Sequence, residues 1–117
     1  MAITSLRMYA EPIRELGFAA ISPVYMGIGA GLSHPSRTLY FQNLTDKLIY
    51  FSFDGINDNF SLPSLGYFVL DVSANRTGPT EAIYFSQGQR IYARSLPGAG
   101  IPTAGVVQVS TFYGTNY

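Results

Sequence analysis

The segment Gly105-Val-Val-Gln-Val-Ser-Thr-Phe-Tyr113, close to the end of the printed sequence, decides the fold class. Its residues alternate between a set that suits a buried core and a set that carries Gln and Ser. The first set is Val107, Val109, Thr111 and Tyr113, and the second is Val106, Gln108, Ser110 and Phe112. A period of two is the side-chain period of a β-strand with one buried face. The segment therefore predicts a strand.

Similar short runs, rich in aromatic and β-branched residues, extend back through the chain and are separated by Gly, Pro and Asn. Their spacing of about 8–12 residues is typical of a sandwich or barrel. The expected strands are Thr38–Asn43, Leu48–Phe53, Phe60–Leu62, Tyr67–Val72, Glu81–Ser86 and Arg90–Ser95, with an earlier strand within Arg14–Met26. We expect hairpin loops at Leu44–Lys47 and Gln87–Gln89. Residues 10–20 are compatible with one short helical turn, since Pro12 suits a first helical position.

These patterns predict an all-β protein with a single antiparallel β-sandwich. We expect about seven or eight strands in a jelly-roll-like arrangement. The sandwich is expected to span residues 16–117 and to follow an extended N-terminal arm, residues 1–15. With 117 residues, the chain is long enough for one modest core, and no segment has the composition of a domain linker.

Composition excludes several function classes. Seven basic and seven acidic residues give a net charge of zero, so the basic footprint of a nucleic-acid-binding protein is missing. The absence of cysteine excludes disulfides and thiol chemistry. No apolar run approaches the roughly 18 residues of a membrane-spanning helix, so we expect no membrane partner. Met1–Met8 lacks the pattern of a signal peptide, so we expect the chain to fold in a cytoplasm.

A second pattern concerns contacts with other subunits. Only 12% of the residues are charged, six of the seven basic residues are Arg, and the chain holds nine Tyr and eight Phe. Arg and aromatic residues are enriched in interfaces, whereas Lys is depleted there. In the expected strand Arg90–Ser95, alternation puts Arg90, Tyr92 and Arg94 on the face opposite Ile91 and Ala93. We predict that these three residues contact another subunit.

The N-terminal arm carries apolar residues without a clear secondary-structure period. They include Ile3, Leu6, Met8, Tyr9 and Ile13, and Pro12 interrupts the segment. An apolar segment that cannot fold on itself needs another surface to cover it. We predict that Ile3, Leu6 and Tyr9 contact a neighbouring subunit. The alternative is that the arm forms an edge strand on its own sandwich.

The segment Phe51-Ser-Phe-Asp-Gly-Ile-Asn-Asp-Asn-Phe-Ser-Leu-Pro63 is dense in oxygen ligands and raises the question of a calcium site. An EF-hand loop that started at Asp54 would have Ile56 at its third position and Leu65 at its twelfth, where ligands are required. Asp-Gly after an apolar run is instead a turn signal, because Gly accepts positive φ and Asp bonds nearby N–H groups. We therefore predict a structural turn made by Asp54, Gly55, Asn57 and Asp58. As an acidic protrusion, it is also a place where a neighbouring subunit's Arg could dock.

No other motif supports an active site. Gly27–Leu32 resembles a dinucleotide-binding loop, but Leu32 stands where that fingerprint needs a third Gly. His34 is the only histidine and has no metal-ligand spacing around it. Glu11 and Glu15 lie four residues apart, but a small sandwich offers little cleft for a carboxylate pair. We assign no catalytic, metal or cofactor-binding residue and expect a non-enzymatic protein.

Four motifs recur together in one known group of proteins. They are Asn43-Leu-Thr-Asp46, Ser52-Phe-Asp-Gly-Ile-Asn-Asp58, Leu70-Asp-Val-Ser-Ala-Asn75 and Thr103-Ala-Gly-Val-Val-Gln-Val-Ser110. In this order they resemble the small β-sandwich structural proteins of tailed bacteriophages, in which they serve as turn and strand punctuation. The resemblance covers roughly residues 13–114. One departure is Asn59, where the pattern has His.

The resemblance implies a virion component in many copies, without a catalytic role. We therefore expect a structural protein of the head–tail connector, neck or tail, made in the cytoplasm of a bacterial host. Its expected partners are copies of itself and other virion proteins. A capsid decoration protein or fibre base is the alternative within the same class. A carbohydrate-binding sandwich, whose Tyr-rich faces would stack on sugars, is the alternative from another class.

Overall fold

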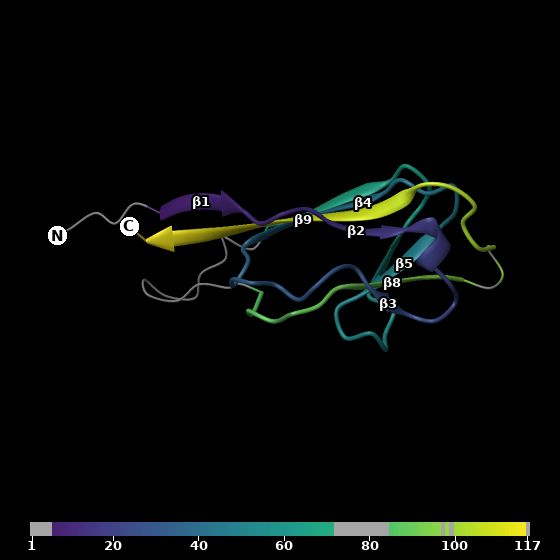
Figure 1. The fold of residues 1–117 in the computed structure, drawn as a ribbon, viewed down its shortest axis with the longest axis horizontal. Helices are drawn as coiled ribbons and strands as arrows, with labels where there is room; N and C mark the ends of the chain where they lie inside the picture. Colours follow the sequence, from purple (N-terminus) through teal and green to yellow (C-terminus); the bar gives the residue numbers. More distant parts are fainter. Residues whose placement is uncertain (1–5, 72–84, 97, 99, 117) are drawn as a thin grey trace.

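The computed structural model describes residues 6–71, 85–96, 98 and 100–116. These residues form an all-β protein, as predicted (Figure 1). The strands are β1 (Leu6–Ala10), β2 (Arg14–Gly17), β3 (Met26–Gly27), β4 (Thr38–Asn43), β5 (Ile49–Ser52), β6 (Phe60–Leu62), β7 (Tyr67–Asp71), β8 (Tyr92–Ser95) and β9 (Val106–Asn116). One 3-10 turn, η1 (Phe18–Ala20), follows β2.

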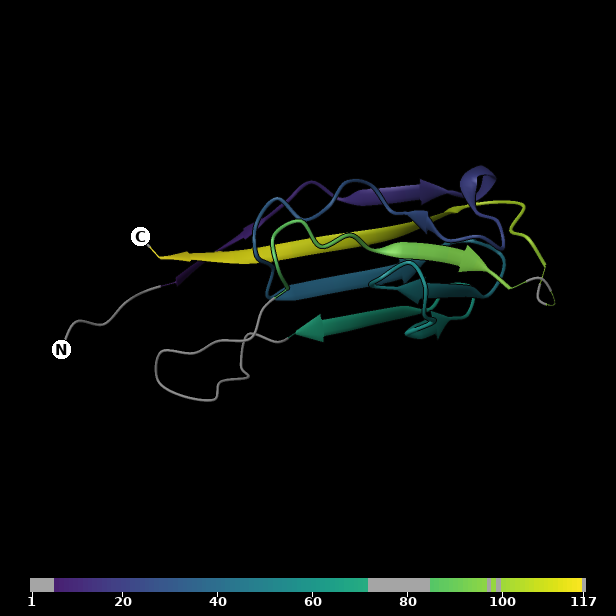
Figure 2. The same cartoon turned by 90° about the horizontal axis from the view of Figure 1, so that it is seen from below.

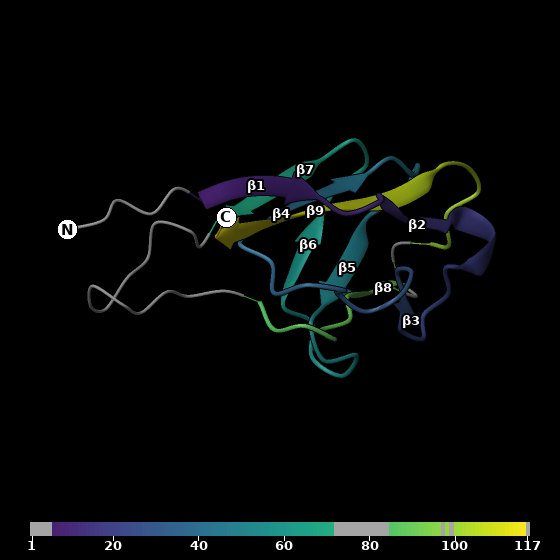
Figure 3. The same ribbon diagram turned by 60° about the vertical axis from the view of Figure 1, so that its left-hand side comes forward.

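The strands form two antiparallel sheets that pack face to face (Figure 3). Sheet A has the order β1-β9-β4-β7, and β2 also pairs with β9. Sheet B has the order β3-β8-β5-β6. Val109 of β9 pairs with Arg14 of β2 and with Phe41 of β4. Since β4 occupies one side of β9, β1 and β2 share its other side and make one interrupted edge.

If β1 and β2 are counted as one strand, the described strands can be renumbered from 1 to 8 in chain order. Sheet A then has the order 1-8-3-6 and sheet B the order 2-7-4-5, which is the strand order of a jelly roll. The fold class is therefore the predicted one. The interruption is a β-bulge, because Glu11, Pro12 and Ile13 lie opposite only Ser110 and Thr111 of β9. Pro has no N–H to donate to a ladder and is tolerated at such a bulged edge.

Several connections differ from the prediction. Leu44–Lys47 does not close a hairpin, because β4 lies in sheet A and β5 in sheet B. The expected strand Glu81–Ser86 falls largely outside the described residues. Its Phe85 forms a bridge with Ser36 and not with β8, so the hairpin predicted at Gln87–Gln89 is wrong at this position. Residues 10–20 hold β2 and η1, and only η1 has helical character.

The core lies between the two sheets and is built by strand alternation. In β4, residues Leu39, Phe41 and Asn43 are buried while their neighbours are half-buried. The buried apolar residues are Ile21, Ile28, Leu32, Leu39, Phe41, Ile49, Phe51, Leu62, Ile91, Ala93, Val107 and Val109. Phe41 joins the two sheets, since its ring centroid lies 5.7 Å from that of Phe51 and 4.9 Å from that of Phe60. Burial of each large apolar side chain contributes about 1.5–3 kcal/mol.

One end of sheet A continues as a narrow ribbon, to the left in Figure 1. Beyond Phe112, which pairs with Thr38 of β4, the residues Tyr113–Asn116 pair with β1 alone among the described strands. The arm predicted for residues 1–15 therefore needs correction. Its described part is a strand on its own sheet, as in the alternative reading, and the predicted boundary at residue 15 falls inside β2.

Candidate functional site

The loop between β5 and β6 holds the predicted turn residues. Oδ1 of Asp54 accepts hydrogen bonds from the backbone N–H groups of Ile56 and Asn57, both at 2.8 Å. Gly55 has φ of +75°, in the left-handed region that favours glycine. Oγ of the buried Ser52 accepts from the N–H groups of Asp54 and Gly55. Asp54 thus closes a turn with its own neighbours, in the β5–β6 hairpin loop.

These hydrogen bonds also fix the charge of Asp54. The N–H of Asn57, then the hydroxyl of Ser52 and the N–H of Ile56 hold the pKa of Asp54 well below its ordinary value of 3.8. A carboxylate whose oxygens already accept several hydrogen bonds from its own loop has little capacity left for a metal ion. Within the described residues, no group of three or more His, Cys, Asp or Glu side chains is placed to hold a metal.

The same loop folds over the outer face of sheet B and forms an ion pair there. Nε and Nη2 of Arg94, in β8, donate to Oδ1 and Oδ2 of Asp58 at 2.9 and 2.7 Å. The hydroxyl of Tyr25 also donates to Oδ1 of Asp58. The guanidinium carbon of Arg94 lies 5.3 Å from the ring centroid of Tyr25 and 5.7 Å from that of Tyr50. We call Tyr25, Tyr50, Asp58, Tyr92 and Arg94 the sheet B cluster.

The cluster lowers the pKa of its carboxylate and raises the pKa values of Tyr25 and Arg94. Hydrogen bonds from Arg94 and then Tyr25 lower the pKa of Asp58 below 3.8. Burial, followed by the hydrogen bond to Asp58, raises the pKa of Tyr25 to about 12. The hydrogen bonds to Asp58 and Tyr25 raise the pKa of Arg94. The ion pair is therefore charged over the whole physiological pH range.

These contacts change the basis of the predicted subunit interface. Arg90, Tyr92 and Arg94 do face away from the core, opposite the buried Ile91 and Ala93. However, Arg94 already has a partner in its own chain, the carboxylate of Asp58. Docking of a neighbouring subunit's Arg at the acidic loop stays a prediction. Contact of this face with another subunit stays a prediction.

Arg90 differs from Arg94, because it is exposed and has no carboxylate partner among the described residues. Its Nε donates to the carbonyl of Gly29 at 3.1 Å, and its guanidinium carbon lies 5.8 Å from the ring centroid of Tyr92. A Cβ at Gly27 would come within 2.4 Å of the Arg90 guanidinium. Gly27, from the apparent dinucleotide loop, thus gives space to an arginine of its own chain.

Two other motifs of the sequence also hold turns, whereas the motif Leu70–Asn75 lies mostly outside the described residues. Asn43 is fully buried, and its Nδ2 donates to the carbonyls of Lys47 and Leu62, each at 2.8 Å. Its Oδ1 accepts from the N–H and the hydroxyl of Thr45 at 3.0 and 2.6 Å. Asn43 ends β4 in sheet A, and its side chain bonds backbone groups of the following loop and of Leu62 in sheet B, so it holds the crossing from β4 to β5. This explains why Leu44–Lys47 is not a hairpin loop.

The segment that leads into β9 packs against the loop between β4 and β5. Asp46 accepts hydrogen bonds from the N–H and the hydroxyl of Thr103. Gly105 has φ of +91°, and a Cβ there would lie 1.9 Å from the carbonyl oxygen of Leu44. Only glycine fits that approach. The Asn-x-Thr-Asp and Thr-x-Gly motifs are therefore two halves of one contact, brought together by the fold.

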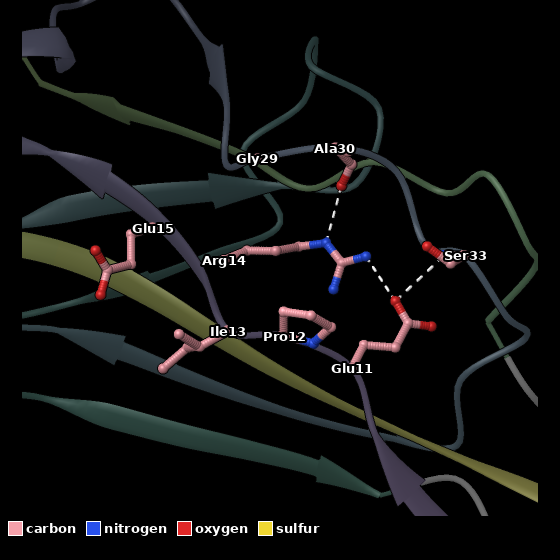
Figure 4. Close-up of a pocket in the computed structure, with 8 residues that line it drawn as sticks. All are labelled: Glu11, Pro12, Ile13, Arg14, Glu15, Gly29, Ala30 and Ser33. Carbon is pink, nitrogen blue, oxygen red and sulfur yellow. Dashed lines mark hydrogen bonds and ion pairs between the residues drawn. The ribbon is translucent and has the colours of Figure 1, made fainter.

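A buried ion pair holds the bulge of the sheet A edge (Figure 4). Nη2 of Arg14 donates to Oε1 of Glu11 at 2.7 Å, and their side chains are only 9% and 3% exposed. Arg14 also donates to the carbonyls of Ala30 and Gly31 and to Oγ1 of Thr111. The two residues are only three positions apart, but the groups that surround the pair come from Ala30, Gly31 and Thr111, up to 97 residues further along the chain, so sequence reasoning missed it.

Both carboxylate oxygens of Glu11 are engaged as well. Its carboxylate also accepts from the N–H groups of Ser33 and His34 and contacts Nδ1 of His34 at 3.1 Å. Burial alone would raise the pKa of Glu11, but the hydrogen bonds from Arg14, Ser33 and His34 bring it below its ordinary value of 4.5. A pocket of about 330 Å³ opens beside this network, lined by residues 11–15, Gly29, Ala30 and Ser33. With every oxygen engaged, Glu11 anchors the 29–34 loop to the sheet.

Apolar side chains are exposed at both edges of sheet A. On β7, Tyr67, Phe68 and Val69 are 68%, 38% and 51% exposed. On β1, Met8 and Tyr9 are exposed, and the ring of Tyr9 stacks on that of Tyr113. Of the other predicted arm contacts, Leu6 lies in β1, and Ile3 lies outside the described residues. The β7 edge was not singled out in the sequence, although its run Tyr67–Leu70 without Lys, Arg or Pro was visible there.

Comparison with known proteins found no matching protein family, no similar curated protein and no similar solved structure. Among the described residues, no helix is long and apolar enough to cross a membrane.

Proposed function

We propose that this chain is a non-enzymatic structural protein of a tailed-bacteriophage virion, present in many copies in the head–tail connector, neck or tail. The observation that carries the proposal is the exposed apolar strand β7 at the edge of sheet A. An exposed edge strand with apolar side chains is a site for pairing with another chain, and proteins that stay monomeric cover or charge such edges. A structural role in an assembly gives this edge a purpose.

The use of the acidic side chains supports a role without catalysis. Glu11, Asp46, Asp54 and Asp58 each accept hydrogen bonds from their own chain and hold a loop in place. Catalytic acids and bases need a free face toward a substrate. Within the described residues, the carboxylates just named stabilise loops of their own chain, as expected if the motifs mark turns and strand ends.

The fold gives weaker support, by analogy. Jelly rolls occur in viral capsid proteins and in lectins, and a fold alone does not define a function. One observation favours the lectin-like alternative, because Tyr25, Tyr50 and Tyr92 share the outer face of sheet B. Their rings are already in contact with Arg90, Arg94 or Gly55. A sugar would have to displace contacts within the chain, so we prefer the structural role.

Mass spectrometry of particles purified from the phage that carries the gene tests the proposal. The chain should be present at many copies per particle and remain after washing in high salt. Its absence from particles would overturn the proposal. A soluble monomer whose melting temperature rises with added sugar would favour the carbohydrate-binding alternative.

A further inference from the structure

We infer that β7 pairs with β7 of a second copy of this chain across a two-fold axis centred on Val69, which joins the two A sheets into one. This inference rests on the proposed function, because it names the contact through which copies of the protein associate.

The first step compares the four sheet edges. Sheet B ends in β3 and β6, which are only two and three residues long. The β1–β2 edge of sheet A is broken by a bulge that contains Pro12. Short strands, bulges and prolines all protect an edge from pairing. In contrast, β7 has five residues, contains no Lys, Arg or Pro, and pairs one to one with β4 from Gln42 to Thr38. It also lies along the rim of the molecule (Figure 2).

The second step identifies the backbone groups that β7 presents on the side away from β4. The N–H of Asn43 donates to the carbonyl of Gly66 at 2.9 Å, whereas the N–H of Leu44 donates to Val106 of β9 at 2.8 Å. Odd-numbered residues of β4 thus bond to β7, and even-numbered ones bond to β9. Because antiparallel residues alternate in this way, Phe68 and Leu70 direct their backbone groups to β4. The N–H and C=O groups of Tyr67, Val69 and Asp71 face outward.

The third step is the symmetry of that outward set. Tyr67, Val69 and Asp71 are evenly spaced about Val69. A two-fold axis perpendicular to the sheet makes the two β7 strands antiparallel, as every neighbouring pair in sheet A already is. With the axis at Val69, this residue pairs with its own copy and Tyr67 pairs with Asp71 of the other copy. The outward N–H and C=O groups of Val69 then pair with those of its own copy.

The side chains fit the same register. Tyr67 and Val69 are 68% and 51% exposed on the outer face, and Phe68 on the inner face is still 38% exposed, although it packs near Phe60. A second β7 would cover apolar surface on both faces. Asp71, the only charged residue of the strand, would lie opposite a tyrosine and not opposite another charge. Like charges directly opposite each other would disfavour the pairing.

A cysteine test is direct, because the chain has no cysteine. Cα atoms of a hydrogen-bonded antiparallel pair lie about 5.5 Å apart, within the range of about 4.4–6.8 Å that a disulfide bridges. Val69→Cys should give a covalent dimer under mild oxidation at micromolar concentration. Ile56→Cys, at a residue that is 81% exposed in the β5–β6 loop, is the matched control and should remain monomeric. Failure of Val69→Cys to cross-link, or equal cross-linking of both variants, would overturn the inference.

A charge exchange tests the two-fold axis itself. Val69→Lys and Val69→Glu should each weaken dimerisation by at least about tenfold, because each puts two like charges face to face. An equimolar mixture of the two variants should dimerise again in sedimentation velocity. Circular dichroism establishes that each variant keeps its sheet signal. Dimerisation of the mixture is expected only if residue 69 faces residue 69 of the other copy. If both variants are impaired and their mixture does not dimerise, the two-fold axis at Val69 is refuted.

Hydrogen exchange distinguishes pairing with a second copy from coverage of β7 by another segment of the same chain. At a dilution where sedimentation shows monomer, the N–H groups of Tyr67 and Val69 should exchange quickly, and those of Phe68 and Leu70 slowly. Protection of all four in the monomer would mean that another segment of the same chain covers the edge. The proposed function fails separately, if purified particles lack the chain while the isolated protein still dimerises through Val69.

Discussion

Arg94 and Asp58 form a two-pronged ion pair that joins strand β8 to the loop between β5 and β6. The two guanidinium nitrogens lie 2.9 and 2.7 Å from the two carboxylate oxygens, and the side chains are 22% and 36% exposed. Two parallel hydrogen bonds make such a pair geometrically specific. The acidic loop is therefore fixed onto sheet B by its own chain.

A double-mutant cycle should detect this coupling. Arg94→Ala and Asp58→Ala are each expected to lower the free energy of unfolding measured in urea. The double variant should cost less than the sum of the two single losses, because the contact between the two side chains is lost only once. Strictly additive losses would contradict the direct contact. Arg90→Ala, on the same face without a carboxylate partner, serves as the matched control and should change stability little.

Acid should destabilise the protein through the same loop. The folded-state pKa values of Asp54 and Asp58 are lowered from 3.8 by their hydrogen bonds. Groups with depressed pKa values stabilise the fold above the unfolded-state pKa, and this stabilisation is lost as the pH falls through the folded-state pKa. The free energy of unfolding should therefore fall below about pH 4. Asp58→Asn should show a smaller fall than the wild type in urea titrations at pH 3 and pH 6, and an equal fall would rule out its contribution.

Gly55 should resist a branched side chain. Its φ of +75° is costly for any β-branched residue, and an added Cβ would lie 3.4 Å from the ring of Tyr92. Gly55→Val is expected to cost about 1–3 kcal/mol. Gly17 has φ of −69° and nothing within 4 Å of an added Cβ, so Gly17→Ala is the control and should be neutral or slightly stabilising. Calcium or chelator should leave both melting curves unchanged, and a calcium-dependent shift would indicate a metal site.

The sequence predicted what depends on local pattern. Alternation in Thr38–Asn43 and the short run Phe60–Leu62 gave strands with the observed bounds, and Asp54-Gly55 was read as a turn from local chemistry. The pairing of strands was harder to predict from the sequence, because Asn43 fixes the crossing from β4 to β5 through contacts with the distant Leu62 and Pro63. The ion pair of Arg94 and Asp58 was missed for the same reason. Arg94 meets Asp58 across 36 residues, and no local pattern specifies such a partner.

The buried pair of Glu11 and Arg14 should contribute more to stability than the exposed charges near it. Arg14→Ala would leave the Glu11 carboxylate buried without its counterion, and breaking a buried pair in this way costs about 3–5 kcal/mol. Glu15 lies next to Arg14 in sequence but is exposed, so Glu15→Ala should stay within about 0.5 kcal/mol of the wild type. Urea unfolding measures both. Similar losses for the two variants would mean that the pair is not anchoring the bulge.

Deletion of Met1–Ala10 tests whether the arm belongs to the folding unit. Within the described residues, the buried apolar core begins at Ile21, and Leu6–Ala10 pairs as β1 with the end of β9. A two-stranded ribbon is marginally stable in water on its own, so its loss should lower the melting temperature by only a few degrees. In a domain of this size, each kcal/mol of lost stability lowers the melting temperature by about 4–8 °C. Retaining Glu11 preserves the ion pair with Arg14. If the arm also contacts a neighbouring subunit, the truncated chain should enter fewer particles while its sandwich stays folded. A truncated chain that unfolds or aggregates at once would show that β1 is part of the core structure and refute an assembly role for the arm.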